Sequence, residues 1–188
     1  DSTDLMAYLN RGYSKSNLEE DEGAIEDFTK AIELDPDNAE AYNYRGLSKY
    51  YLDDNKGAIE DCTKAIELDS TYADAYNNRG ITKDYLEDYE GAIEDFTKAI
   101  ELDPDNVEAY GYRCHLKYYL EDYEGVLEDC NKAIELDPTD GAYYNNRGVA
   151  KGNLDDDEGA IEDFTKAIEL DPTDGGHYNN RGLSKGYL

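Results

Sequence analysis

The sequence Ala-Ile-Glu-Asp-Phe-Thr-Lys-Ala-Ile-Glu-Leu-Asp-Pro occupies residues 24–36 and recurs unchanged at residues 92–104 and 160–172. Near copies begin at Ala58 and Val126, so each copy follows the one before it by 34 residues. The same step governs a tyrosine column, which consists of Tyr8, Tyr42, Tyr76, Tyr110, Tyr144 and Tyr178. A fixed period of this length indicates an array of one repeated supersecondary unit.

Within each unit, small and apolar residues have the spacing of two helices. In residues 39–72, Tyr42 and Gly46 share one face of a first helix, and Ala58 and Ala65 form a stripe on a second helix. The small residues allow the two helices to approach closely. Such a hairpin is too small to bury its own apolar face, so neighbouring hairpins must stack into a solenoid.

The 34-residue period, the early tyrosine, the glycine four residues after it and the Ala…Phe…Ala…Pro pattern of the second helix resemble the tetratricopeptide repeat (TPR) family. The resemblance implies an all-α fold, a right-handed superhelical solenoid of antiparallel helix hairpins. We expect five 34-residue repeats and a terminal half-repeat. The expected boundaries are an N-terminal cap segment at 1–4, repeats at 5–38, 39–72, 73–106, 107–140 and 141–174, and the first helix of an incomplete sixth repeat at 175–188.

Two basic columns depart from the leucine and tyrosine that are usual in the family. The first holds Arg11, Arg45, Arg79, Arg113, Arg147 and Arg181, and the second holds Lys15, Lys49, Lys83, Lys117, Lys151 and Lys185. Both columns point toward the second helix, where Asp27, Asp61, Asp95, Asp129 and Asp163 recur. Because a buried charge needs a partner, we expect a repeated Arg/Lys–Asp ladder. The alternative is that these columns bind a ligand.

A third departure falls in the turn between the two helices. Where the family usually has glycine, this chain has Glu19, Asp53, Glu87, Glu121 and Asp155.

The resemblance also implies that the first helices line a concave surface that holds ligands. The candidate peptide-binding residues on this surface are Asn43, Tyr44, Leu47, Tyr50, Tyr51, Asn77, Asn78, Ile81, Tyr85, Tyr112, His115, Tyr119, Asn145, Asn146, Asn179 and Asn180. Asparagine is a poor helix former, yet its amide can donate to and accept from a peptide backbone. Tyrosine is enriched at interfaces. We therefore expect asparagine tethers and tyrosine platforms; the alternative is that duplication spread both columns and few members touch a ligand.

Charge narrows the class of partner. The formal net charge is -28, and the concave columns hold no lysine or arginine. We therefore expect a protein or peptide ligand of neutral to basic charge, and we disfavour an acidic C-terminal tail and nucleic acid. No apolar run is long enough to suggest a membrane span. No arrangement of side chains suggests catalysis or a metal site, so we expect no enzyme activity, no metal and no cofactor.

The chain has three cysteines, Cys62, Cys114 and Cys130. An odd, sparse number argues against a disulfide framework. We expect buried, reduced thiols in a cytoplasmic protein. Because the sequence begins at Asp1, a removed targeting signal is the alternative.

The rival function is a self-assembling scaffold. The first helix, with Leu5, Met6 and Leu9, has no preceding repeat to cover it, and the last half-repeat carries the basic residues Arg181 and Lys185. Contact between these ends would be electrostatically favourable. The expected product is a head-to-tail homo-oligomer that does not close on itself.

Overall fold

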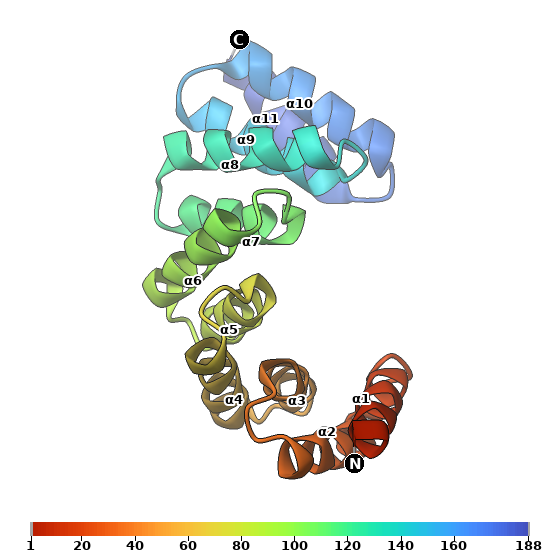
Figure 1. Ribbon diagram of the computed structural model, residues 1–188. Helices are drawn as coiled ribbons and strands as arrows, with labels where there is room; N and C mark the ends of the chain where they lie inside the picture. The colour runs from red at the N-terminus through yellow and green to blue at the C-terminus, as the bar shows by residue number, and fades with distance from the viewer. Residues whose placement is uncertain (1, 188) are drawn as a thin grey trace. The chain divides into compact units, whose positions relative to one another are not determined.

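The computed structural model describes residues 2–187, and the side chains of residues 4–186 (Figure 1). Every regular element in this range is an α-helix. The helices are α1 (Ser2–Ser16), α2 (Asp21–Leu34), α3 (Ala39–Tyr51), α4 (Asn55–Leu68), α5 (Ala73–Tyr85), α6 (Tyr89–Leu102), α7 (Val107–Tyr119), α8 (Tyr123–Leu136), α9 (Gly141–Asn153), α10 (Asp157–Leu170) and α11 (Gly175–Tyr187). Residues 2–4 form the first turn of α1 and not a separate cap segment, while Asp1 lies outside the described residues.

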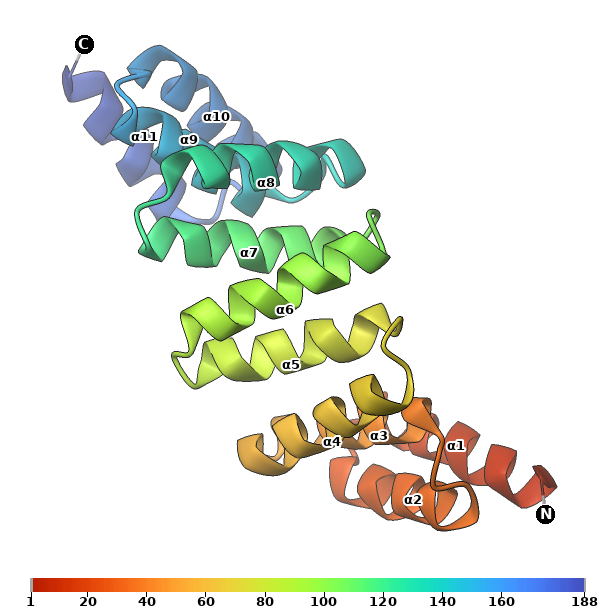
Figure 2. The ribbon, with the colours of Figure 1, turned by 60° about the vertical axis from the view of Figure 1, so that its left-hand side comes forward.

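The chain divides into two compact units, residues 1–104 with α1–α6 and residues 105–188 with α7–α11. Inside each unit, an odd-numbered helix packs against the even-numbered helix that follows it, and that helix packs against the next odd-numbered one (Figure 2). Successive odd-numbered helices of a unit also touch, as α3 and α5 do, whereas successive even-numbered helices make no such contact among the described residues. The odd-numbered helices therefore form the inner layer of each unit.

The expected ion-pair ladder is present in all five hairpins. In α3–α4, the Nε and Nη2 atoms of Arg45 donate to the two carboxylate oxygens of Asp61 at 2.7 Å each. The Nζ atom of Lys49 lies 2.7 Å from the same carboxylate. The Arg45 guanidinium also lies over the ring of Tyr42, 5.4 Å from its centroid. The remaining Arg–Lys–Asp triads are Arg11, Lys15 and Asp27; Arg79, Lys83 and Asp95; Arg113, Lys117 and Asp129; and Arg147, Lys151 and Asp163.

In three of the triads the arginine also reaches the hairpin before its own. The Nη1 atom of Arg45 donates to Thr29 at 3.2 Å, and that of Arg79 donates to Thr63 at 3.2 Å. Arg147 makes the same kind of bond to Asn131 at 2.8 Å. Each of these planar side chains thus joins three helices, which is a use that a lysine could not match. This structural engagement leaves the ligand-binding alternative for the basic columns without support.

The acidic residues in the turns adopt the left-handed conformation that glycine normally fills. Glu19, Asp53, Glu87, Glu121 and Asp155 have φ between 58° and 63°. At the end of α3, the N–H of Asp53 donates to the carbonyl of Tyr50 at 3.0 Å, and the N–H of Asp54 donates to that of Lys49 at 2.9 Å. This pair of bonds defines a Schellman motif. The turn is therefore preserved without glycine, at a conformational cost to each L-residue.

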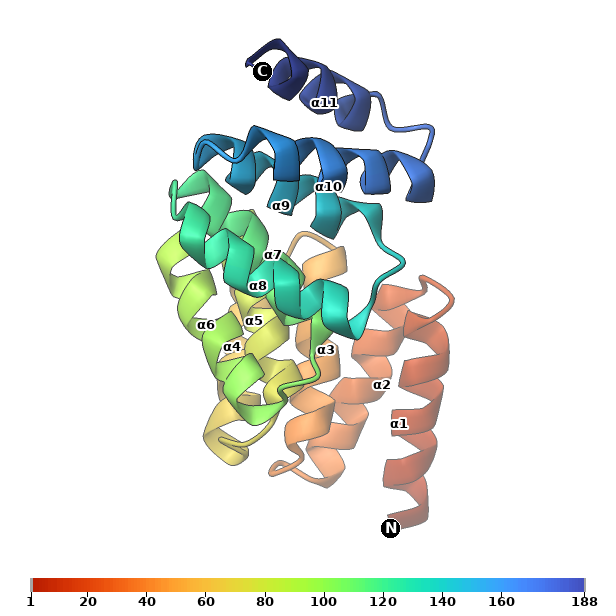
Figure 3. The same ribbon diagram turned by 90° about the horizontal axis from the view of Figure 1, so that it is seen from above.

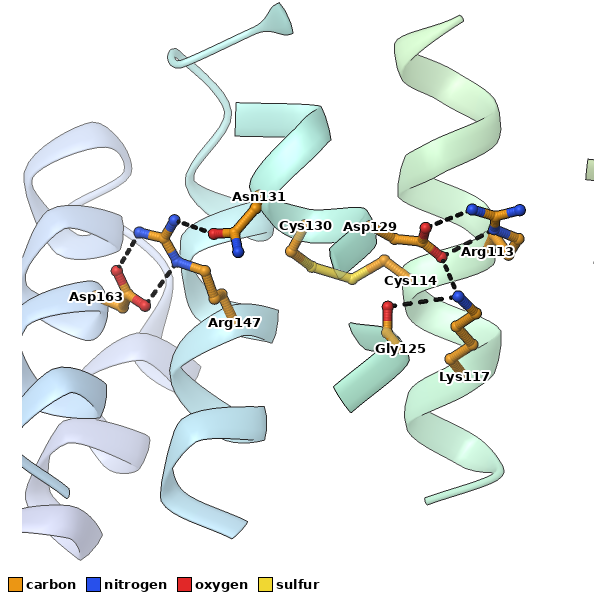
Figure 4. The surroundings of a disulfide bond; sticks show 9 residues. All are labelled: Arg113, Cys114, Lys117, Gly125, Asp129, Cys130, Asn131, Arg147 and Asp163. Carbon is orange, nitrogen blue, oxygen red and sulfur yellow. Dashed lines mark hydrogen bonds and ion pairs between the residues drawn. A yellow bond between two sulfur atoms is a disulfide. The ribbon is translucent and has the colours of Figure 1, made fainter. Parts of the chain in front are cut away.

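Between the two helices of a hairpin, a glycine of the odd-numbered helix faces a larger side chain of the even-numbered one. A Cβ placed on Gly80 would lie 2.9 Å from the ring of Phe96, so this helix pair requires glycine there. In α7–α8 the same two positions hold Cys114 and Cys130, which form a disulfide (Figure 4). The expectation of three reduced thiols is therefore wrong for this pair.

The sequence contained a signal for the disulfide. Cys114 and Cys130 are separated by 16 residues, which is also the separation of Arg113 and Asp129 in the ladder. The two pairs are adjacent in sequence, so the helices that bring the ion pair together also bring the cysteines together. Cys62 remains a free, buried thiol, and burial raises its pKa to about 12. Because disulfides persist in oxidising compartments, the cysteines no longer support the cytoplasmic expectation.

Candidate functional site

Two of the predicted asparagine tethers are buried. Only 1% of Asn43 and 5% of Asn77 is exposed. The amide nitrogen of Asn43 donates to the Tyr72 hydroxyl at 3.2 Å, and its oxygen accepts from the amide of Asn78 at 2.9 Å. Asn43 and Asn77 are therefore not available on an open surface, and for Asn43 the cover comes from Tyr72 and Asn78, which follow it in the chain.

The asparagine columns connect neighbouring odd-numbered helices. Asn78 of α5 bonds to Asn43 of α3, and Asn180 of α11 bonds to Asn145 of α9 at 3.1 Å. These amide pairs recur at the same positions in both units. Much of the recurrence of asparagine is therefore explained by packing between repeats, while Asn179 is exposed to solvent.

In residues 1–104, the exposed inner layer is aromatic. Tyr51 and Tyr85 are 60% and 59% exposed. Tyr50 joins them, with its ring centroid 5.6 Å from Tyr51 and 5.9 Å from Tyr85. The hydroxyl of Tyr85 donates to Asp53 at 3.3 Å. The structure therefore brings these three predicted tyrosines together as one surface, which we call the α3–α5 tyrosine patch.

Other predicted residues of this unit are less exposed than the tyrosine patch. Tyr44 is half-buried against Tyr13, with 4.5 Å between ring centroids. Tyr44 and Leu47, with Tyr51 at the rim, help to line a shallow hollow of about 230 Å³ between α1 and α3. Ile81 is half-buried.

In residues 105–188, three predicted residues meet in a hollow of about 340 Å³ between α7 and α9. Tyr112, His115 and Asn146 line it, and Tyr119 stands beside it with its ring 4.8 Å from that of His115. The rest of the lining is Glu108, Gly111, Ala142 and Tyr143. We call this feature the α7–α9 hollow.

Tyr143 and Gly111 line this hollow but were not among the residues predicted from the sequence. A signal was available, because Tyr143 stands where Ala7, Ala41, Ala75 and Ala109 recur, and Gly111 stands in the asparagine column. A Cβ placed on Gly111 would lie 2.9 Å from a ring carbon of Tyr143. The two departures from the repeat are therefore coupled in space.

Acidic groups dominate the electrostatics of both inner layers. The pKa of Tyr143 is raised by burial and then by the nearby charges of Asp140, Asp137 and Glu108. Burial likewise raises the pKa of the Asp74 carboxyl on α5. No lysine or arginine lines the hollow between α1 and α3 or the α7–α9 hollow. The described inner layers are therefore suited to neutral or cationic groups.

Among the described residues, no group of three or more His, Cys, Asp or Glu side chains is placed to hold a metal ion. The helices of residues 2–187 include none that is both long and apolar enough to cross a membrane.

Stacked antiparallel helix hairpins with a repeated glycine–aromatic core pair define a helical-repeat protein. The chain belongs to the tetratricopeptide repeat family: the tetratricopeptide repeat model matches residues 73–106 and 142–174, and a second TPR repeat model matches residues 12–52. Together these matches cover more than half of the sequence. No curated protein sequence matches the chain.

Solved structures of the family are similar to this fold. YrrB, described as a TPR protein with an unusual peptide-binding site, is 25% identical with a TM-score of 0.78, covering 94% of this chain and 91% of YrrB. The first TPR of Spaghetti (RPAP3), bound to the HSP90 peptide SRMEEVD, is 28% identical with a TM-score of 0.61, covering 64% and 95%. MamA from Desulfovibrio magneticus RS-1 is 22% identical with a TM-score of 0.78, covering 92% and 97%, and supports the fold alone.

Proposed function

We propose that this chain is a protein-interaction module that binds a neutral-to-basic peptide across its odd-numbered helices. The observation that carries the proposal is the α3–α5 tyrosine patch, where Tyr51 and Tyr85 are each more than half exposed although both are large aromatic side chains. Exposed aromatic clusters of this kind mark interaction surfaces, because each ring offers apolar area with a polar tip. The peptide-binding site described for YrrB and the peptide complex of the first TPR of RPAP3 support the same use of the fold.

The ladder supports the proposed charge of the ligand. The peptide bound by the RPAP3 relative, SRMEEVD, contains two glutamates and a terminal aspartate. In this chain, five arginines and five lysines of the odd-numbered helices are engaged by aspartates of the even-numbered ones. Those charges cannot receive an acidic tail without breaking the ladder. Together with the net charge of -28, this arrangement favours a neutral or basic peptide.

The experiment is a selection from a random peptide library, followed by anisotropy titration of an enriched peptide. We expect Tyr51→Ser with Tyr85→Ser to weaken binding about tenfold, because two partly exposed aromatic contacts are lost. Leu34→Ser is the matched control, since Leu34 is 46% exposed but lies on the even-numbered helix α2. Equal binding by the wild type and the double variant, or enrichment of peptides like SRMEEVD, would contradict the proposal.

End-to-end assembly is the second candidate. Helix α11 packs on α10 (Figure 3), and it exposes 45% of Tyr178 and 56% of Leu183. A Cβ on Gly182 would meet nothing within 4 Å, whereas the equivalent Gly148 is covered by Phe164. This apolar area, with Arg181 beside it, supports contact with the acidic surface of another copy. Light scattering over a concentration series tests it: mass that grows for the wild type and not for Leu183→Glu supports assembly, and constant mass rejects it.

A further inference from the structure

The near-identity of the repeats makes each local departure visible. Three of the departures on α7 and α9 are Gly111 in the asparagine column, Tyr143 in the alanine column, and His115 in a column that otherwise holds Tyr13, Leu47, Ile81, Val149 and Leu183. All three departures line the α7–α9 hollow. Helices α3 and α5 keep the ordinary residues at these places, so this hollow is a local specialisation of the array.

The geometry explains why two of the departures occur together. The ring of Tyr143 occupies the space beside α7 that a side chain at position 111 would need, with 2.9 Å from its Cε1 atom and 3.2 Å from its hydroxyl to a Cβ built on Gly111. Gly111 therefore allows the half-buried ring of Tyr143 to lie across α7. Tyr112 adds a second aromatic ring to the lining.

The carboxylate and amide groups of the hollow suit a cation. Glu108 contributes a carboxylate, and Asn146 contributes an amide whose oxygen accepts hydrogen bonds. Asp137 and Asp140 act on Tyr143 from the turn before α9. Aromatic faces attract cations, and a carboxylate beside them adds a charge-assisted hydrogen bond. A guanidinium uses both features at once, because it is planar, stacks on rings and donates two parallel bonds to a carboxylate.

We propose that the α7–α9 hollow binds the side chain of an arginine in the peptide ligand, stacked on the tyrosines and hydrogen-bonded to Glu108. This inference rests on the proposed peptide-binding function and gives it a sequence preference. The ligand residue is arginine in preference to lysine, because an ammonium ion lacks the planar face and the paired donors.

The test is an NMR titration of the ¹⁵N-labelled chain with N-acetyl-arginine N-methylamide. We expect weak, saturable binding, with amide shift changes centred on Gly111, His115 and Asn146. The lysine analogue should bind about threefold more weakly, since cation–π contact and paired hydrogen bonding are reduced. The citrulline analogue, which is neutral and similar in shape, should show no saturable binding.

Two variants test the assignment to residues. Glu108→Gln should weaken binding of the arginine analogue about threefold to fivefold, as expected for a partly exposed charge pair. Glu40→Gln is the matched control, because Glu40 holds the same position in α3. The double variant Gly111→Asn with Tyr143→Ala gives α7 and α9 the residues that Asn43 and Ala75 supply in α3 and α5, so it should fold and lose the site.

The inference is overturned if citrulline binds as well as arginine, if Glu108→Gln behaves like Glu40→Gln, or if the double variant binds unchanged. Its failure is separable from that of the proposed function. An enriched peptide that needs the α3–α5 tyrosine patch, with no binding of the arginine analogue, rejects the arginine site alone. An arginine site without any enriched peptide rejects the peptide-binding module and leaves the hollow as a guanidinium site.

Discussion

The hairpins α5–α6 and α7–α8 share an Arg–Lys–Asp triad but differ in the side chains that fill the space between their helices. Arg79 and Lys83 form ion pairs with Asp95 in the first hairpin, and Arg113 and Lys117 form ion pairs with Asp129 in the second. The N–O distances of the two triads are nearly the same. The core pair is Gly80 with Phe96 in the first hairpin and a disulfide in the second.

The inner-layer surfaces of the two hairpins differ as well, with Ile81 in α5 and His115 in α7 at equivalent positions. The ladder contacts are nearly the same in both hairpins although the pair beneath them differs, so we expect the ladder to hold the spacing of the helices. The exposed surface also differs between the units, with the α3–α5 tyrosine patch in one and the α7–α9 hollow in the other.

The largest effect on stability should come from removing the aspartate of the Arg–Lys–Asp triad. Asp129 is fully buried and Arg113 is 12% exposed, while Asp95 and Arg79 are 5% and 17% exposed. Asp95→Asn and Asp129→Asn should each lower the free energy of unfolding by about 3–5 kcal/mol, because two cations are left without their counter-charge. Urea denaturation measures both.

A matched control separates charge from packing. Replacing Arg79, Lys83 and Asp95 together with Met, Leu and Leu should cost much less than Asp95→Asn, because no unpaired charge remains. If either Asp→Asn variant loses under about 1 kcal/mol, which is the size of a surface ion pair, the ladder does not set the hairpin geometry.

The next effect should distinguish the two hairpins. Reducing the disulfide should destabilise α7–α8 by about 3 kcal/mol, the value expected for a closed loop of this length, and leave α5–α6 unchanged. Amide hydrogen exchange with and without reductant measures the stability of each hairpin separately. Cys114→Gly with Cys130→Phe restores the pair found at Gly80 and Phe96, so it should fold and lose its response to reductant.

Thiol counting checks the premise of that comparison. Because burial raises the pKa of the Cys62 thiol to about 12, no thiol of the folded chain should react with a disulfide reagent at pH 8. The unfolded, unreduced chain should show one thiol, and the reduced chain three. Three thiols before reduction would show that Cys114 and Cys130 do not form a disulfide. The difference between the hairpins would then be one of packing alone.

The smallest effect should be common to both hairpins. Glu87 and Glu121 have φ of 63° and 58°, so Glu87→Gly and Glu121→Gly should each stabilise the chain by about 1 kcal/mol. Thermal unfolding measures the gain. In contrast, Asp88→Ala and Asp122→Ala should destabilise by about 1 kcal/mol, because each aspartate accepts a hydrogen bond from the third residue of the following helix. Loss of stability in the glycine variants would show that the acidic side chains make a compensating contact.

The repeat, the helix pairing and the ladder were readable from the sequence alone. Periodicity identifies the unit because every copy must bury the same stripe against the same neighbours. The Arg, Lys and Asp columns predict one another, since a cation facing the inside of a hairpin requires an anion there. The turn positions were also identified, because acidic residues replaced an expected glycine.

Only the tertiary structure decided which residues of the inner layer reach solvent. Asn43 and Tyr51 both belong to α3, yet one is 1% exposed and the other 60%. The difference arises from the next hairpin, whose Tyr72 and Asn78 close over Asn43 but not over the end of the helix.

The α7–α9 hollow also depends on contact between repeats. Tyr143 of the following repeat lies against Gly111 of α7, and this contact forms part of the hollow. A sequence period specifies what each helix repeats, whereas burial depends on the distance and rotation between helices that are far apart in the chain.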